Sequence, residues 1–212
     1  LTQSQNIVNL PDGFTSLGFD DHVKLFFPTG KIEADGEPEF VSRDYTPRRY
    51  DPASNELDID FVLHGPGPAS EWAAAVQPGQ QLSIGGPRGS FVVSGHFDWH
   101  LLVGDDAAIP AIARRLEELP ADAQVDVLIE VGGAGDEIAL QAPPATRLRW
   151  LHRGTAEPGS PALLLAALRV IELPPGSVKK GEVMLTMGYP LDFETFGGAF
   201  MYTMGGDRMA LG

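Results

Sequence analysis

The sequence is most informative at Arg43-Asp44-Tyr45-Thr46-Pro47-Arg48 and, after one short strand, at His64-Gly65-Pro66-Gly67-Pro68-Ala69-Ser70-Glu71-Trp72. The first segment places a guanidinium, a phenol and a hydroxyl group close together. The second is a glycine- and proline-rich turn that opens a helix, whose first backbone N–H groups have no partner within the helix. An aromatic face with a hydrogen-bonding hydroxyl suits a flat ring, and a fixed charge with free N–H groups suits phosphates. We therefore predict a flavin-binding protein.

Alternation along the first segment assigns its side chains to two faces. Arg43, Tyr45 and Pro47 are expected on one face, and Thr46 and Arg48 on the other. On this interpretation Tyr45 covers the flavin ring, Thr46 hydrogen-bonds a ring nitrogen and Arg43 pairs with a phosphate. The alternative is an exposed strand with a surface arginine and tyrosine. For the turn after His64, the alternative is an ordinary helix cap.

Composition limits the classes of function. The chain has 212 residues, of which 43% are hydrophobic and 21% are charged, values that suit one or two globular domains. Twenty-nine acidic against 15 basic residues give a net charge of −14, which disfavours nucleic acid and anionic lipid as partners. The absence of cysteine excludes disulfides and thiolate metal sites.

The chain carries no targeting or membrane-spanning pattern. No apolar run approaches the ~20 residues that cross a bilayer. The N-terminal residues lack a signal-peptide pattern, and the missing initiator Met suggests that residues precede Leu1. We expect a cytoplasmic monomer.

The first ~95 residues have the pattern of an antiparallel barrel. A short apolar strand ends at Pro28, and residues 56–63 alternate acidic and apolar side chains, which is typical of a strand with one solvated face. A helix is expected over 70–76, with Ser70 as its N-cap.

The pattern changes from about residue 97, with a domain boundary expected near Ser94 and Gly95. Strands at 99–103, 125–131 and 148–152 alternate with helices at 109–119 and 161–171, which predicts a parallel sheet covered by helices. Gly104-Asp105-Asp106-Ala107 lies between a strand and a helix, where nucleotides dock in such sheets. Two aspartates there oppose a pyrophosphate.

Other chemistries lack a motif. The five histidines show no metal spacing beyond His96 and His100, and there is no Gly-x-Ser-x-Gly or Walker sequence. We predict no metal site and no catalytic acid–base residue.

In this order, the motifs resemble those of the siderophore-interacting protein family, flavin-dependent ferric-siderophore reductases of the ferredoxin-reductase superfamily. The resemblance covers about Asp20 to Gly176, including residues 21–28, 43–48, 58–73, 79–89, 104–112, 129–131 and 150–153. It implies a β plus α/β fold: a six-stranded antiparallel FAD-binding barrel over residues 1–94 and a parallel-sheet, NAD(P)-binding-like domain over residues 95–176. Residues 177–212 do not match the family, and their role is unknown.

The resemblance also implies a reaction and its site. FAD would pass electrons from NAD(P)H or a reduced ferredoxin to a ferric siderophore, which releases ferrous iron. The cofactor-binding residues would be Arg43, Tyr45, Thr46, Asp60, His64, Gly67, Ala69, Ser70 and Trp72. Basic side chains would attract the chelate, and for these we select Arg48, Arg49 and Arg153.

Three departures from the family leave alternatives open. Ala107 stands where the family has Thr or Ser, which removes a hydroxyl group near the flavin. The first strand of the barrel has no evident counterpart, and residues 184–212 are rich in Gly, Met and Phe. The alternatives are a general NAD(P)H:flavin or quinone oxidoreductase of the same superfamily, and a flavin-binding module without enzymatic activity.

Overall fold

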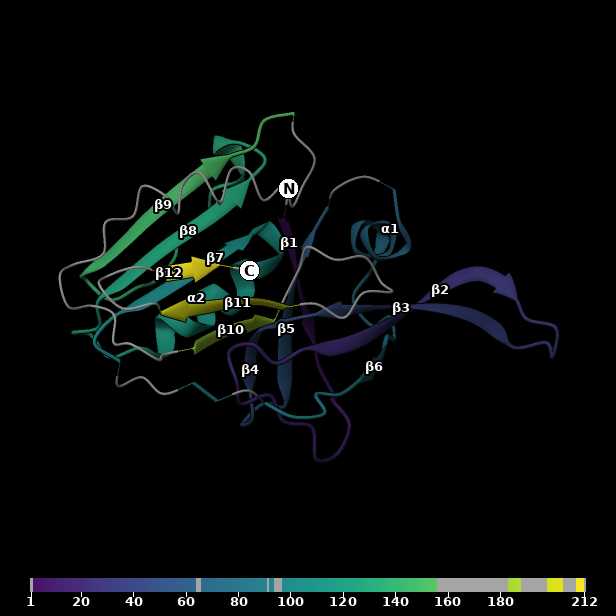
Figure 1. The fold of residues 1–212 in the computed structure, drawn as a ribbon. Coiled ribbons are helices and arrows are strands. Elements are labelled where there is room, and N and C mark those ends of the chain that lie inside the picture. Colours follow the sequence, from purple (N-terminus) through teal and green to yellow (C-terminus); the bar gives the residue numbers. More distant parts are fainter. Residues whose placement is uncertain are drawn as a thin grey trace. The chain divides into compact units, whose positions relative to one another are not determined.

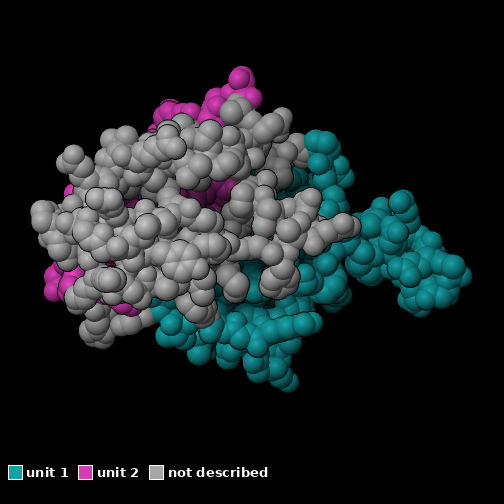
Figure 2. Space-filling view, viewed as in Figure 1, with its two compact units in different colours: residues 1–95, 109–119, 139–142 teal, residues 96–108, 120–138, 143–212 magenta. Residues whose placement is uncertain are grey.

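The computed structural model describes most of the chain up to residue 155 and three short strands beyond it (Figure 1). The described ranges are 2–63, 66–90, 92–93, 97–155, 183–187, 198–203 and 209–211. The chain divides into two compact units (Figure 2). Unit 1 consists of residues 1–95, 109–119 and 139–142, and unit 2 of residues 96–108, 120–138 and 143–212. The domain limits expected at residues 94 and 176 stay a prediction.

Unit 1 contains two antiparallel sheets of three strands each. The first has the order β1 (Thr2–Ile7), β5 (Glu56–Val62), β4 (Pro47–Asp51), and the second the order β3 (Pro38–Tyr45), β2 (Val23–Ile32), β6 (Ser83–Gly85). The antiparallel character of the first region is thus confirmed. No strand pairing joins the two sheets in the part of the chain that the structure describes, so the closed barrel stays a prediction.

Strand β1 corrects the expectation that the first strand was missing. It pairs with β5 along its whole length, from Thr2 opposite Val62 to Ile7 opposite Leu57. Its sequence, TQSQNI, is mostly polar because β1 lies at the edge of its sheet, where side chains alternate between exposed and half-buried positions. A search for apolar alternation therefore misses it.

Strand β2 also differs from the prediction, because it continues past Pro28 to Ile32. Strand β6 pairs with β2 only over Lys24–Phe26. Beyond Phe26 no other strand among the described residues pairs with this edge of β2, and a proline is tolerated there. Beyond the residues that pair with β6, strands β2 and β3 continue as a two-stranded hairpin that projects from unit 1 (Figures 1 and 2).

The core of unit 1 forms between the inward faces of β2 and β5. Alternation directs three side chains of each strand inward, and all six are fully buried: Val23, Leu25, Phe27, Leu57, Ile59 and Phe61. Burial of each large apolar side chain contributes about 1.5–3 kcal/mol. The alternating pattern of β5 therefore correctly predicted its solvated face.

Two helices belong to unit 1. Helix α1 (Pro68–Ala75) packs through Ala69 and Ala73, and it begins two residues before the expected start, because Pro68 suits the first turn. Its N-cap is Gly67, so the expected cap at Ser70 was wrong. Helix α2 (Ile109–Glu118) confirms the helix expected over 109–119 and contacts β4.

Unit 2 contains the predicted parallel sheet. Its order is β7 (His100–Asp105), β8 (Val125–Val131), β9 (Thr146–His152), and every residue of β8 is buried. Two short 3-10 helices, η1 (Asp106–Ala108) and η2 (Ala134–Asp136), follow β7 and β8. The helix expected over 161–171 lies outside the described residues.

Beyond residue 155 the described backbone forms one further antiparallel sheet. Its order is β10 (Val183–Met187), β11 (Gly198–Thr203), β12 (Met209–Leu211). Among the helices that the structure describes, none is both long and apolar enough to cross a bilayer.

Candidate functional site

The segment around Tyr45 forms a junction between the two sheets of unit 1. Strand β3 ends at Tyr45 in one sheet and β4 begins at Pro47 in the other, so Thr46 alone joins them. Arg43 and Tyr45 lie opposite Leu25 and Val23 of β2. Residues directly opposite each other share a face of the sheet. Arg43 and Tyr45 therefore share the face that leads to the core, as the alternation predicts.

Tyr45 belongs to a cluster of four aromatic rings. Its ring centroid lies 4.6 Å from that of Phe61 and 6.3 Å from that of Phe27. Trp72 of α1 contacts the same two rings, at 5.8 Å from Phe61 and 5.5 Å from Phe27. Phe27 and Phe61 are fully buried, whereas Tyr45 and Trp72 are only half-buried. The two predicted residues thus share one aromatic base and keep surface for a ligand ring.

Burial and charge both act on the Tyr45 phenol. Burial raises the pKa of Tyr45 above its ordinary value, and the positive charge of Arg43 partly opposes this shift. The Arg43 guanidinium donates to the carbonyl oxygen of Ser42 at 2.8 Å. A cation and a phenol therefore lie next to each other at the aromatic cluster.

The start of α1 lies one turn before Trp72 of this cluster and supplies backbone N–H groups instead of rings. Gly67 caps the helix without a side-chain hydrogen bond, and a Cβ atom built on Gly67 would meet nothing within 4 Å. The Gly67 N–H donates to Oε1 of Glu71 at 3.3 Å, so a phosphate that binds there would displace this carboxylate. Ala69 is buried and Ser70 half-buried. His64 lies outside the described residues.

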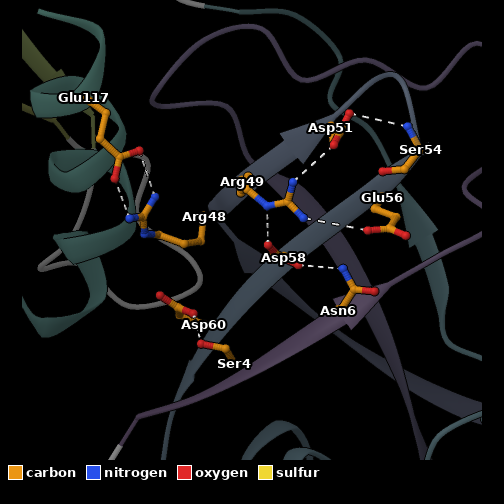
Figure 3. A network of polar contacts seen from close by, with 10 residues as sticks. All are labelled: Ser4, Asn6, Arg48, Arg49, Asp51, Ser54, Glu56, Asp58, Asp60 and Glu117. Atoms are coloured by element: carbon orange, nitrogen blue, oxygen red, sulfur yellow. Dashed lines mark hydrogen bonds and ion pairs between the residues drawn. The ribbon is translucent and has the colours of Figure 1, made fainter. Parts of the chain in front are cut away.

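Asp60 is not brought together with these residues. It follows Ile59 and precedes Phe61 on β5, so its side chain lies on the opposite face from the aromatic cluster. There it accepts a hydrogen bond from the Ser4 hydroxyl at 2.5 Å (Figure 3).

Arg48 and Arg49 lie on the polar side of unit 1 and are paired with carboxylates (Figure 3). Arg48 binds both carboxylate oxygens of Glu117 on α2, at 2.6 and 3.2 Å. Arg49 donates to Asp58 at 2.6 Å and also contacts Asp51 and Glu56. Both arginines line a pocket of about 350 Å³, which is completed by Ser4, Asp58, Asp60, Glu117 and Gln141.

Arg153 lies in unit 2, at the carboxyl end of β9. Its side chain is 10% exposed, donates to Asp106 at 2.7 Å and lies 3.7 Å from the buried Glu130. Of the three arginines selected for the chelate, Arg153 is therefore the one enclosed among acidic groups at the end of the parallel sheet.

Ala107 lies in the turn of η1, where its N–H donates to Oδ1 of Asp105 at 3.0 Å. Burial raises the pKa of Asp105, and the neighbouring Asp106 adds to this shift. The turn is therefore held by an aspartate side chain.

Phe27 and Phe61 are the residues that sequence reasoning missed as part of the site. Both were assigned to strands, but neither was selected as a site residue. The signal was available in part, because Phe61 immediately follows Asp60 and faces inward by alternation. The contact of Phe27 with Trp72 joins residues 45 positions apart and has no local signal.

The residues of unit 1 suit FAD. A half-buried tyrosine and tryptophan offer an aromatic surface, and Arg43 offers a positive charge. The start of α1, where Gly67 makes no side-chain capping bond, offers backbone N–H groups near open space. The family resemblance implies that Arg43, Tyr45 and Thr46 would hold the flavin ring and its phosphates, and that Gly67, Ala69, Ser70 and Trp72 would hold the adenine-diphosphate half. Because Trp72 contacts the same two phenylalanine rings as Tyr45, it would also lie beside the ring.

Three family models match the chain. Residues 8–91 match the siderophore-interacting FAD-binding domain, and residues 97–183 match the siderophore-interacting protein model. Residues 165–212 match a model described as ETF-QO, ubiquinone-binding. The last match covers the part of the chain that the resemblance left without a role.

Curated relatives match most of the chain. An NADPH-dependent ferric-chelate reductase of Escherichia coli is 42% identical over 66% of this chain and 61% of its own length. The ferric vibriobactin reductase ViuB of Vibrio cholerae is 37% identical over 78% of this chain and 65% of its own length. The chain thus spans less than two thirds of the length of these relatives.

Solved structures agree with the observed sheets. A cytochrome b5 reductase domain of Ulva prolifera nitrate reductase, 16% identical, covers 74% of this chain and 70% of its own with a TM-score of 0.55, which shows the fold alone. The observed sheets and this neighbour thus support a β plus α/β fold. A siderophore utilization protein from T. fusca is 38% identical, with a TM-score of 0.68 over 82% of this chain and 78% of its own. The chain belongs to the siderophore-interacting protein family.

Proposed function

We propose that this chain is a flavin-dependent reductase that transfers electrons from NAD(P)H or a reduced ferredoxin through FAD to a ferric siderophore, with release of ferrous iron, and that it acts in the cytoplasm. One observation carries the proposal. Tyr45 and Trp72 meet on a shared aromatic base, within the region that matches an FAD-binding domain of this family. The names of the E. coli and V. cholerae relatives supply the reaction class.

The residues have separate tasks in this proposal. Bound FAD would supply the change from two-electron to one-electron transfer that iron reduction requires. Tyr45 and Trp72 orient the ring, Thr46 hydrogen-bonds it and Arg43 neutralises phosphate charge. We further propose that β1 to β6 close into the barrel of the family. Reduction converts the ferric ion to the ferrous ion, which hard oxygen ligands bind much less tightly. The reduction itself therefore releases the iron, and no side chain needs to move a proton.

The approach of the ferric chelate is assigned to Arg48 and Arg49. Their guanidinium groups line one pocket of unit 1, although Glu117 and Asp58 neutralise them in part. Arg153 is a weaker candidate, because only a tenth of its side chain is exposed.

An absorption spectrum tests the proposal most directly. The purified chain, after incubation with FAD, is expected to be yellow, to be bleached by NADH, NADPH or reduced ferredoxin, and to form ferrous iron from a ferric catecholate or hydroxamate chelate. Released flavin is identified by chromatography. A colourless protein that takes up no FAD contradicts the proposal.

A second candidate function is a quinone oxidoreductase. The observation that favours it is the match of residues 165–212 to a ubiquinone-binding model. Turnover of a short-chain ubiquinone by the FAD-loaded protein, with ferric chelates inert, would favour this candidate. Reduction of ferric chelates with no quinone turnover would exclude it.

A further inference from the structure

A buried arginine of α2 is anchored to the backbone next to the candidate flavin site. The Arg114 side chain belongs to a residue that is only 8% exposed, and it makes three hydrogen bonds within unit 1. It donates to the Ser16 hydroxyl and carbonyl oxygens, each at 3.1 Å, and to the Pro47 carbonyl oxygen at 3.2 Å. A buried charge is costly unless it is hydrogen-bonded in this way. These contacts therefore fix the position of α2 against two backbone segments.

The Pro47 carbonyl lies where the strand pairing is irregular. Pro47 is opposite Ile59, but the register between β4 and β5 shifts before Arg49. Such irregularities leave backbone groups without their regular partners. At this position the Arg114 guanidinium donates to the Pro47 carbonyl oxygen, so this carbonyl needs no N–H group from β5.

Pro47 is directly next to Thr46 and two residues from Tyr45, the residues proposed to contact the ring. Thr46 is the single residue between β3 and β4, and Pro47 follows it directly. Packing of Tyr45 on Phe61 fixes the β3 side of this junction, and Arg114 fixes the β4 side. A second contact of α2 with β4 is the ion pair between Glu117 and Arg48, the residue after Pro47 (Figure 3).

We propose that Arg114 is a positioning residue for the flavin, because its hydrogen bond to Pro47 fixes the backbone of Thr46 and thereby the contact of Thr46 with the ring. The inference rests on the proposed function. Helix α2 follows β7, the first strand of the parallel sheet, in the sequence. The inference is that a residue of this helix positions the FAD-binding segment of unit 1.

The test compares three variants at a temperature where all are folded. Arg114→Met removes the three donors, Arg114→Lys keeps the charge with one donor group, and Leu116→Ala removes a buried side chain of the same helix that makes no hydrogen bond. Leu116→Ala is the control for simple loss of stability. The readouts are FAD affinity, the visible flavin spectrum, the flavin midpoint potential and hydrogen exchange of residues 44–49 in the FAD-free protein.

Arg114→Met is expected to weaken FAD binding by about 10- to 100-fold, with a shifted spectrum and potential and faster exchange at 44–49. Arg114→Lys should recover part of each effect, and Leu116→Ala should lower thermal stability without a spectral shift. Wild-type affinity, spectrum and exchange in Arg114→Met would overturn the inference, as would equal shifts in Leu116→Ala.

The failure of the inference can be told apart from that of the proposed function. If the wild-type chain takes up no FAD, the proposed function fails and the role of Arg114 toward the ring fails with it. Hydrogen exchange then still shows whether Arg114 orders the junction. If the wild-type chain binds FAD and Arg114→Met is unchanged, only the inference is wrong.

Discussion

The two faces of β5 have opposite characters over the same seven residues. One face carries Leu57, Ile59 and Phe61, which are fully buried and end in the aromatic cluster. The other carries Glu56, Asp58 and Asp60, which bind Arg49, Asn6 and Ser4 (Figure 3). The side-chain period of two in a strand produces this separation.

This difference indicates which face carries function. The inward face is apolar and ends in the aromatic cluster, so a substitution at Phe61 removes packing and ring contacts together. The outward face is a network of hydrogen bonds and ion pairs between partly exposed groups, and exposed ion pairs contribute little to stability. We therefore expect large effects on FAD binding from one face and small effects from the other.

The largest effect is expected for Phe61→Ala. Loss of a fully buried ring at the centre of the cluster should lower the free energy of unfolding by about 3–5 kcal/mol and abolish FAD binding. Chemical denaturation and flavin fluorescence measure the two effects. Val62→Ala, which shortens the neighbouring half-buried side chain on the other face, is the matched control. Equal losses in both variants would contradict the contrast between the faces.

Tyr45→Ala comes next. Removal of its ring should weaken FAD binding by about 1–3 kcal/mol with a smaller loss of stability, because Tyr45 is only half-buried. Titration of the FAD-free protein with FAD measures the change. Tyr45→Phe keeps the ring and should stay close to wild type. If Tyr45→Ala binds FAD with unchanged affinity, the assigned contact is wrong.

A smaller effect is expected for Asp58→Asn, which removes the carboxylate that Arg49 and Asn6 share. The Tm should fall by at most about 3 °C at low salt, and the difference should shrink in about 1 M NaCl, because salt screens exposed pairs. FAD affinity should not change. A difference that persists at high salt would show that the network is not a solvated one.

The smallest effect is expected for Asp60→Asn. Its carboxylate binds Ser4 on the outward face, so FAD affinity should stay within about twofold of wild type. Ser4→Ala is the companion variant and should behave in the same way. A large loss of FAD in Asp60→Asn alone would show that Asp60 reaches the cofactor, as the family resemblance implied.

Local periodicity predicted much of this architecture. The alternation of residues 56–63 predicted both faces of β5, and the one-residue spacing placed Arg43 and Tyr45 on one face. The strand and helix alternation after residue 97 predicted the parallel sheet, which the structure confirms.

Long-range partners could not be predicted in this way. Arg48 was selected as a basic side chain that could attract the chelate, but it is paired with Glu117, 69 residues away on α2. Arg153 was selected for the same reason, and Asp106 lies 47 residues before it. Whether a basic side chain is available to a ligand depends on which carboxylates the fold brings to it. Sequence spacing does not contain this information.

The projecting hairpin of β2 and β3 has a practical use. Its tip closes at Gly36, which adopts a φ of 91°, and the N–H of Glu33 donates to the carbonyl of Glu37 at 2.8 Å. Tyr45 lies seven positions along β3 from Pro38, which corresponds to about 23 Å. Because the sequence contains no cysteine, a cysteine introduced at Asp35 would give this chain a single site for a thiol-reactive fluorescent label. This site lies far from the residues proposed to contact the ring.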